Sequence, residues 1–169
     1  KGAVDMKQYR YKYGHGEVDF SLDPALVRAE LTIRDYPVLP DPVAAVEAAI
    51  RDPFGAAPLW EIVSPGQSVA FIVNDPTRVA NTHVFLPVLI DEIHAVGVPY
   101  EDMCIVFALG SHRLMTEAEM IEEVGAEVAA KIKMYNSDCK DPSQFQYFGE
   151  TSRGTPVYFH KKVAEADHI

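Results

Sequence analysis

Residues 67–78 read Q-S-V-A-F-I-V-N-D-P-T-R, and this stretch decides the fold. Residues 69–73 form an unbroken apolar run, without the polar alternation of a strand that has one face in water. Such a run is typical of a strand buried on both faces, in a parallel sheet with helices above and below. The chemistry then changes to Asp75, Thr77 and Arg78. These polar side chains follow the carboxyl end of a strand, which is where ligands bind in open α/β sheets.

The composition narrows the class of protein. The chain has 169 residues, a formal net charge of −10 and 48% hydrophobic residues, which suits one α/β domain with a proper core. An acidic chain is not expected to bind nucleic acid. No apolar run approaches the ~20 residues that span a bilayer, and no signal peptide is recognisable. We therefore expect a cytoplasmic protein without nucleic-acid or membrane partners, in which Cys104 and Cys139 are buried free thiols.

A second apolar run, residues 103–109, comes after a stretch whose apolar residues have helical spacing. Strand, helix and strand make a βαβ unit with a right-handed crossover, so the two strands lie parallel and end at the same edge of the sheet. The segment G-S-H-R follows the second strand and contains His112 and Arg113. We therefore expect residues 75–78 to face these two side chains.

The other patterns predict the surrounding elements. They are a β-hairpin at 8–22, a connector at 36–40, helices at 42–51, 58–63 and 82–96, a helix from Thr116 with a break at Gly125, a strand at 132–135 and a hairpin at 145–160. Residues 29–33 are ambiguous but compatible with a short strand. The expected fold class is α/β, a mostly parallel sheet with helices on both faces (a Rossmann-like three-layer sandwich) plus β-hairpin appendages.

The expected domain organisation is one α/β domain over residues 1–169. We divide it into a hairpin and connector (1–40), a βαβ core (41–135), and a hairpin with the start of a further unit (136–169). Residues 164–169 read like the lead-in to another core strand. We therefore expect the chain to be the N-terminal domain of a longer, two-domain protein.

The residue types at the two strand ends fit proton transfer beside a small acid. His112 can donate or accept a proton near neutral pH. Arg78 and Arg113 can each hold a carboxylate or phosphate through paired N–H groups, and Asp75 can orient a neighbouring donor. A plainer interpretation stays open, in which Asp75 and Arg78 form an ion pair that braces the loop, His112 caps a turn and Arg113 is structural.

Several other kinds of site are not indicated. The glycine patterns of dinucleotide-binding and P-loop proteins and the G-x-S-x-G elbow of serine hydrolases are absent. His83 and His94 do not have the i, i+4 spacing of metal ligands on a helix. We assign no metal ligand to these residues, nor to His160 or His168.

Two motifs carry a resemblance to a known family. The D-P-T-R loop is followed some thirty residues later by A-L-G-S-H-R-L-M-T-E-A-E-M. The pair resembles the D-x-T-R and G-x-H-R-P-x-T-x-E-E motifs of the nickel-dependent lactate racemase family. Residues 52–55, 151–157 and 163–167 are similar to that family too. The resemblance covers nearly the whole chain, most firmly from Val43 onward.

The resemblance implies a 2-hydroxyacid racemase or epimerase that uses a nickel-pincer nucleotide as cofactor. In that family, hydride leaves the substrate α-carbon for the cofactor and returns to the other face, while paired histidines remove and restore the hydroxyl proton. At the matching positions, His112 would be one of the acid/base histidines and Arg78 would help to hold the substrate carboxylate. Asp75 and Thr77 would line the cofactor side, and Arg113 is a further candidate for binding the cofactor.

The chain departs from the family in what it lacks. The second acid/base histidine, the lysine bonded to the cofactor and the nickel-ligating histidine all follow the V-A-E-A-D segment, and Ile169 precedes them. Neither Lys161 nor Lys162 occupies the place of that lysine. The expected partners are therefore a small 2-hydroxy acid and the C-terminal domain of the same protein, and residues 1–169 alone are expected to be inactive.

Two alternatives remain at this point. Pro76 and residues 79–80 differ from the usual family pattern, which leaves room for a substrate other than lactate. A protein of another class is also compatible with the sequence, namely a non-catalytic α/β module that binds a small anion or a partner domain through Arg78 and Arg113.

Overall fold

The computed structural model describes residues 5–169, which form two compact units, one up to Val38 and the other Leu39–Ile169. In the first unit, β1 (Lys7–Tyr13) and β2 (Gly16–Leu22) form an antiparallel hairpin. The ring of Phe20 stacks on those of Tyr9 and Tyr11, with both centroids 5.5 Å away. These contacts confirm the predicted hairpin.

Residues 29–33 do not form the short strand with which their sequence is compatible. The side chains of Leu31 and Ile33 are 94% and 97% exposed, and no strand of residues 5–169 pairs with this segment. A strand needs a neighbour for its N–H and C=O groups, so apolar residues alone do not make one here.

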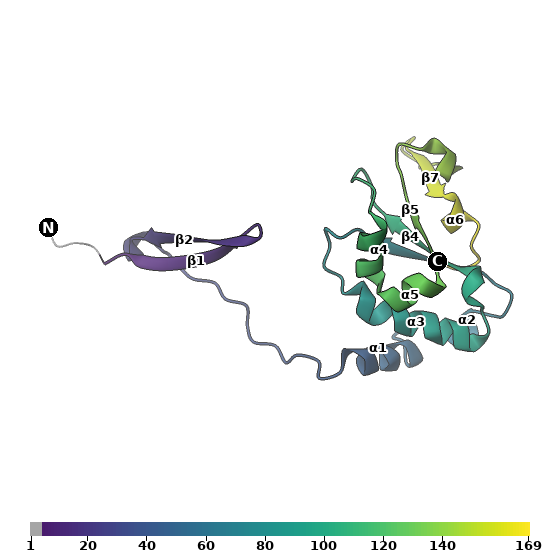
Figure 1. Ribbon diagram of the computed structural model, residues 1–169, viewed down its shortest axis with the longest axis horizontal. Helices are drawn as coiled ribbons and strands as arrows, with labels where there is room; N and C mark the ends of the chain where they lie inside the picture. The colour runs from purple at the N-terminus through teal and green to yellow at the C-terminus, as the bar shows by residue number, and fades with distance from the viewer. Residues whose placement is uncertain (1–4) are drawn as a thin grey trace. The chain divides into compact units, whose positions relative to one another are not determined.

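The second unit is built on a parallel sheet of β3 (Val69–Asn74), β4 (Met103–Ala108) and β5 (Lys133–Asn136), in that order. Both crossovers run in the same direction across the sheet, so the right-handed rule places their helices on one face. These helices are α3 (Thr82–Val96), α4 (Glu117–Val124) and α5 (Ala126–Lys131), as Figure 1 shows. The βαβ unit and the third parallel strand are thus confirmed.

The core lies mainly on this helical face. It contains side chains from the sheet and from α3, α4 and α5: Phe71, Val73, Leu86, Ile90, Ile105, Phe107, Val124 and Val128. On the opposite face, Ala70 and Val106 of the sheet form a smaller buried cluster with Val163 of α6 (Lys161–Ala164). The predicted α/β class with helices on both faces is therefore correct, and within residues 5–169 the second face is only partly covered, since Ile72 is 53% exposed there.

The remaining elements surround this sheet. They are α1 (Pro42–Arg51), α2 (Leu59–Ile62), β6 (Phe145–Glu150), β7 (Pro156–His160) and the 3₁₀ turns Pro24–Leu26, Tyr100–Asp102 and Pro142–Gln144. The Asp41 side chain caps α1 by accepting from Ala44 N at 3.0 Å, as D-P at a helix start predicts. Arg51 of α1 forms an ion pair with Glu92 of α3, with Arg51 Nη2 and Glu92 Oε1 2.6 Å apart.

Three further sequence expectations can be compared with the structure. Cys104 and Cys139 are free thiols; Cys104 is half-buried in β4, where burial raises its pKa, whereas Cys139 is exposed in the loop after β5. The expectation of burial is therefore wrong for Cys139.

The end of the chain does pair with the sheet, since His168 bridges Val69 in parallel. None of the helices described in residues 5–169 has the length and hydropathy needed to cross a bilayer.

Candidate functional site

The loop after β3 is a tight turn braced by its own side chains. Arg78 N donates to Asp75 O at 3.2 Å. The side-chain amide of Asn74 donates to the carbonyl oxygens of Asp75 and Arg78 at 3.0 and 3.1 Å. Because the turn is hydrogen-bonded internally, its backbone has a defined conformation before any ligand binds.

Asp75 is the buried acid of this turn, with only 6% of its surface exposed. Its Oδ1 accepts hydrogen bonds from Thr77 Oγ1 at 2.6 Å and from Thr77 N at 3.2 Å. This arrangement is a side-chain turn of the kind that Asp forms with the backbone two residues on. Thr77 therefore occupies one carboxylate oxygen and leaves the other, Oδ2, free to reach across the sheet edge.

The partner of that second oxygen is His112. The chain leaves β4 through Gly110, whose φ of +57° is a left-handed conformation that glycine adopts without strain. His112 N then donates to Leu109 O at 3.0 Å, and its ring Nδ1 is hydrogen-bonded to Asp75 Oδ2. The bond to His112 and, after it, the bond from Thr77 lower the pKa of Asp75.

This pairing selects the tautomer of the neutral imidazole. An ionised carboxylate can only accept, so Nδ1 of His112 carries the hydrogen and Nε2 of the neutral ring is free to accept a proton. The His112 side chain is 56% exposed, so it is accessible to a ligand. Asp75 and His112 together form a unit that can take and return one proton.

The two arginines differ in their partners. Arg78 is exposed, and no ion pair with it is present in the described part of the chain. The interpretation in which Asp75 pairs with Arg78 is therefore wrong, because His112 takes the place of the arginine. Arg78 retains its guanidinium N–H groups for an anion.

Arg113, by contrast, forms a two-pronged ion pair with Glu119. Its Nη2 and Nη1 lie 2.6 and 2.9 Å from Oε1 and Oε2, and this pairing lowers the pKa of Glu119 to about 2. Glu119 also accepts from Thr116 N at 2.9 Å in the predicted capping box. Arg113 thus braces the start of α4, so the geometry favours the structural interpretation of this residue.

Three carboxylates of α4, which are not among the site residues expected from the sequence, lie near Arg78. Glu119, Glu122 and Glu123 of α4 line a hollow of about 310 Å³ together with Arg78. They would repel an anion inside that hollow, so we expect an anion at the sheet edge beside His112 instead. The T-x-x-E pattern predicts that Glu119 caps α4, but sequence alone gave no signal for its bond to Arg113.

No three His, Cys, Asp or Glu side chains gather into a possible metal site in residues 5–169. His94 binds Val98 O through Nδ1 at 2.9 Å and stacks on Tyr100. His160 caps α6 by accepting from Lys162 N at 3.2 Å. These histidines have structural partners, and neither lies with Asp75 and His112.

The chain is similar to known lactate racemases. A family model described as the lactate racemase N-terminal domain matches residues 13–169. Lactate racemase of Lactiplantibacillus plantarum is 26% identical over 122 residues, which is 72% of this chain and 28% of that protein. Lactate racemase of Thermoanaerobacterium thermosaccharolyticum is 24% identical over 164 residues, 96% of this chain and 38% of that protein.

Solved structures agree on the fold. The lactate racemase apoprotein of Thermoanaerobacterium thermosaccharolyticum superposes with a TM-score of 0.76 at 22% identity, over 95% of this chain and 37% of that chain. A Thermotoga maritima protein superposes with a TM-score of 0.54 over 72% of this chain and 30% of that chain, at 18% identity.

The present chain thus spans well under half the length of the racemases it matches. The family model nevertheless covers nearly all of it, including both loops that meet at Asp75 and His112. The chain belongs to the lactate racemase N-terminal domain family.

Proposed function

We propose that this chain is the part of a lactate racemase-like 2-hydroxyacid racemase or epimerase that moves the proton of the substrate hydroxyl. The observation that carries this proposal is the hydrogen bond between Asp75 and His112, which joins the two family motifs at the ends of β3 and β4. An imidazole held by a buried carboxylate is well suited to general acid–base work.

His112 would act through Nε2. In the neutral ring this atom accepts the proton of the substrate hydroxyl while Nδ1 stays bonded to Asp75. The imidazolium that forms is stabilised by the carboxylate, as in other His–Asp pairs. In the reverse direction Nε2 returns the proton to the same enantiomer, and the second proton-transfer group expected beyond residue 169 would serve the other one.

Asp75 takes a different role from the one that the family resemblance implies. Rather than only lining the cofactor side, it would orient His112 and select its tautomer, and Thr77 would hold Asp75 through Oδ1. Asp75 is thus a positioning residue, and contact of Asp75, Thr77 or Arg113 with a cofactor stays a prediction.

Arg78 would bind the substrate carboxylate. Its guanidinium has no carboxylate partner among residues 5–169, and it lies on the same loop as Asp75. A planar guanidinium holds a carboxylate through two parallel N–H···O bonds, which fixes the direction of the α-carbon. In this proposal the α-hydroxyl of the same small molecule would then reach His112 Nε2.

The cofactor fits this chain only in part. When bound, a nickel-pincer nucleotide would supply the acceptor for the α-hydrogen. Arg78 suits an anionic group of substrate or nucleotide, but the described residues include no cluster of nickel ligands. We therefore assign the proton-transfer half of the site to this chain and expect the covalent lysine and the nickel-ligating histidine beyond residue 169.

Nickel and nucleotide analysis of the full-length gene product is the test of this function. We expect mass spectrometry to detect a nickel-bearing nucleotide bound to a lysine, and chiral chromatography to detect interconversion of a 2-hydroxy acid. A full-length product that binds neither metal nor nucleotide, yet binds small carboxylates through Arg78, would instead support the alternative, a non-catalytic anion-binding module.

A further inference from the structure

β3 has the sequence of an inner strand but lies at the edge of its sheet. Its residues, V-A-F-I-V-N, lack polar alternation, as is typical of parallel strands covered on both faces. In the described residues, one side of β3 pairs with β4 along the whole length of β3. The other side of β3 has only an isolated bridge, at Val69. An apolar edge with unpaired backbone groups is a template for another strand.

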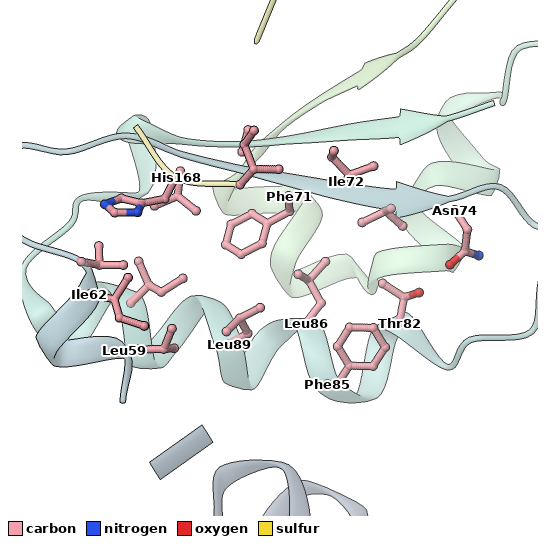
Figure 2. A pocket seen from close by; sticks show the side chains of 16 residues that line it. Leu59, Ile62, Phe71, Ile72, Asn74, Thr82, Phe85, Leu86, Leu89 and His168 are labelled. Carbon is pink, nitrogen blue, oxygen red and sulfur yellow. The ribbon is translucent and has the colours of Figure 1, made fainter. Parts of the chain in front are cut away.

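An apolar groove of about 460 Å³ runs along this free edge. Figure 2 shows Leu59, Ile62, Leu89 and Phe85 of α2 and α3 lining it opposite β3. Ile62 and Phe85 are 44% and 37% exposed, and on the opposite face Ile72 is 53% exposed. Apolar side chains that gather at one edge in this way mark an interaction surface.

The end of the chain already begins to pair with this edge. His168 N donates to Ser68 O at 3.0 Å, and His168 O accepts from Ala70 N at 2.9 Å, so His168 lies opposite Val69 in parallel. The Asp167 carboxylate accepts from Ser68 N and Oγ at 2.8 and 2.9 Å, which lowers the pKa of Asp167. A strand that continued from His168 would therefore run parallel to β3, in the register set by the His168–Val69 bridge.

We propose that the free edge of β3 binds a further parallel strand of the same chain, supplied by the residues that follow Ile169. N–H groups alternate between the two sides of a strand, so those of Ile72 and Asn74 point the same way as that of Ala70, away from β4. The second residue after His168 would bond Ala70 and Ile72, and the fourth would bond Ile72 and Asn74.

The same register predicts the side chains of this strand. Paired residues in a parallel ladder project to the same face, so the second and fourth residues after His168 share the face of Phe71 and Val73. That face packs against α2 and α3, where the groove lies. We therefore expect large apolar side chains at these two positions, filling the groove.

The added strand would also complete a wall of the candidate site. Asn74 lies five residues after Val69, so the fifth residue after His168 reaches the carboxyl end of β3. The chain beyond it would emerge beside Asp75. The strand order would then reverse at β3, and such a reversal is where open α/β sheets bind ligands. The proposal concerns the sheet and holds whether the full protein is a racemase or an anion-binding module.

Hydrogen exchange measured by NMR tests this pairing. We compare residues 1–169 with the chain extended by about ten residues that its gene encodes, the length of a long strand. In the extended chain, the amides of Ile72 and Asn74 are expected to exchange at least about tenfold more slowly. The amides of Phe71 and Val73, which face β4, serve as internal controls and are protected in both chains.

Equal exchange of Ile72 and Asn74 in the two chains would overturn the proposal, as would a gene that ends after Ile169. Protection that rises with protein concentration in residues 1–169 and persists unchanged in the extended chain would assign the edge to a second copy instead. Light scattering on the same samples separates these outcomes.

The substitution Ile72→Pro tests the same pairing by removing one backbone N–H from the free edge of β3. Proline is tolerated in an edge strand where its missing N–H would face water. The variant is therefore expected to keep the protection of Phe71 and Val73 in residues 1–169, but to lose the added protection of Asn74 in the extended chain. An extended variant in which Asn74 remains protected would contradict pairing at this edge.

Discussion

Asp75 is buried, and each of its carboxylate oxygens has its own hydrogen-bond partner: Thr77 at Oδ1 and His112 at Oδ2. An acceptor-only group placed in this way decides which nitrogen of the imidazole carries the hydrogen. The chemistry of His112 therefore depends on a residue 37 positions away in sequence.

The first prediction concerns this tautomer. We expect ¹⁵N NMR of residues 1–169 to show hydrogen on Nδ1 of neutral His112, and Asp75→Asn to move it to Nε2, because the new amide can donate to Nδ1. The same substitution should lower racemisation by the full-length enzyme by up to about 10⁴-fold, the loss seen when a triad aspartate becomes asparagine.

Thr77→Val is the matched control for that experiment. It removes the hydroxyl bond to Asp75 but keeps the carboxylate, so His112 should retain hydrogen on Nδ1. A wild-type spectrum with hydrogen on Nε2 would rule out the assigned role of Asp75.

The second prediction concerns the pH dependence of the pair between Arg113 and Glu119. The pKa of Glu119 is lowered from 4.5 to about 2, so the pair stabilises the folded state fully above about pH 4.5 and loses this effect as the pH falls toward 2. Glu119→Gln should therefore lower the free energy of unfolding at pH 7, and the difference from the wild type should vanish near pH 2.

Urea unfolding at several pH values measures that difference. As a control, Thr116→Ala removes the N-cap hydroxyl of α4 and should cost about 1 kcal/mol, most of which persists at low pH because the bond that this hydroxyl accepts from Glu119 N does not titrate. A Glu119→Gln difference that stayed constant from pH 7 to pH 2 would contradict the ion pair.

The helices and strands owe their positions to a few local signals and to one topological rule. The apolar runs of β3 and β4, the D-P start of α1 and the capping box of α4 each predict an element that the structure contains. The right-handed crossover then predicts that Asp75 and His112 lie close together, which is confirmed.

What the sequence did not predict depends on pairings between elements. Residues 29–33 carry strand-like residues but have no partner strand in the part of the chain that the structure describes. Arg113 bonds Glu119 instead of remaining free, and α6 is too short, at four residues, to show a periodicity. Propensity and spacing cannot specify such features because tertiary contacts decide them.

The third prediction concerns the end of α3. Gly97 has a φ of +109°, and a Cβ built on it would lie 2.9 Å from Pro65 Cγ. Gly97→Ala should therefore destabilise the fold through both backbone strain and this contact, by on the order of 1–3 kcal/mol. Thermal or urea unfolding measures the loss.

Gly55→Ala is the control for the contact. Gly55 has a φ of +72° but no atom within 4 Å of its Cβ position, so this variant carries the backbone strain alone. We expect it to be less destabilising than Gly97→Ala. Equal losses in the two variants would show that Pro65 yields without a free-energy penalty.

At the scale of the whole chain, the proposed site lies at one end of a parallel sheet whose β3 edge is largely unpaired in residues 5–169. Asp75, His112 and Arg78 are the residues to which we assign proton transfer and anion binding in the proposed function, and no cluster of metal ligands is present in residues 5–169. The chain covers 28% and 38% of the lactate racemases to which it is similar. As proposed, the function requires the second proton-transfer group and the covalent lysine of the family, which the resemblance places outside this unit.

The fourth prediction follows from that requirement. Residues 1–169 alone are expected to show no racemisation of D- or L-lactate, even when supplied with cofactor, because the second proton-transfer group and the covalent lysine of the family are expected beyond Ile169. Chiral chromatography after long incubation measures this, and any turnover above a buffer blank would refute the prediction.

The most direct test is the racemisation rate of the full-length enzyme carrying His112→Ala. The rate should fall on the order of 10²–10⁴-fold, the usual contribution of a general acid–base group. His94→Ala, whose ring stacks on Tyr100 next to the start of β4, is the matched histidine control and should leave the rate near that of the wild type. Full activity in the His112→Ala enzyme would remove His112, and with it the Asp75–His112 pair, from the reaction.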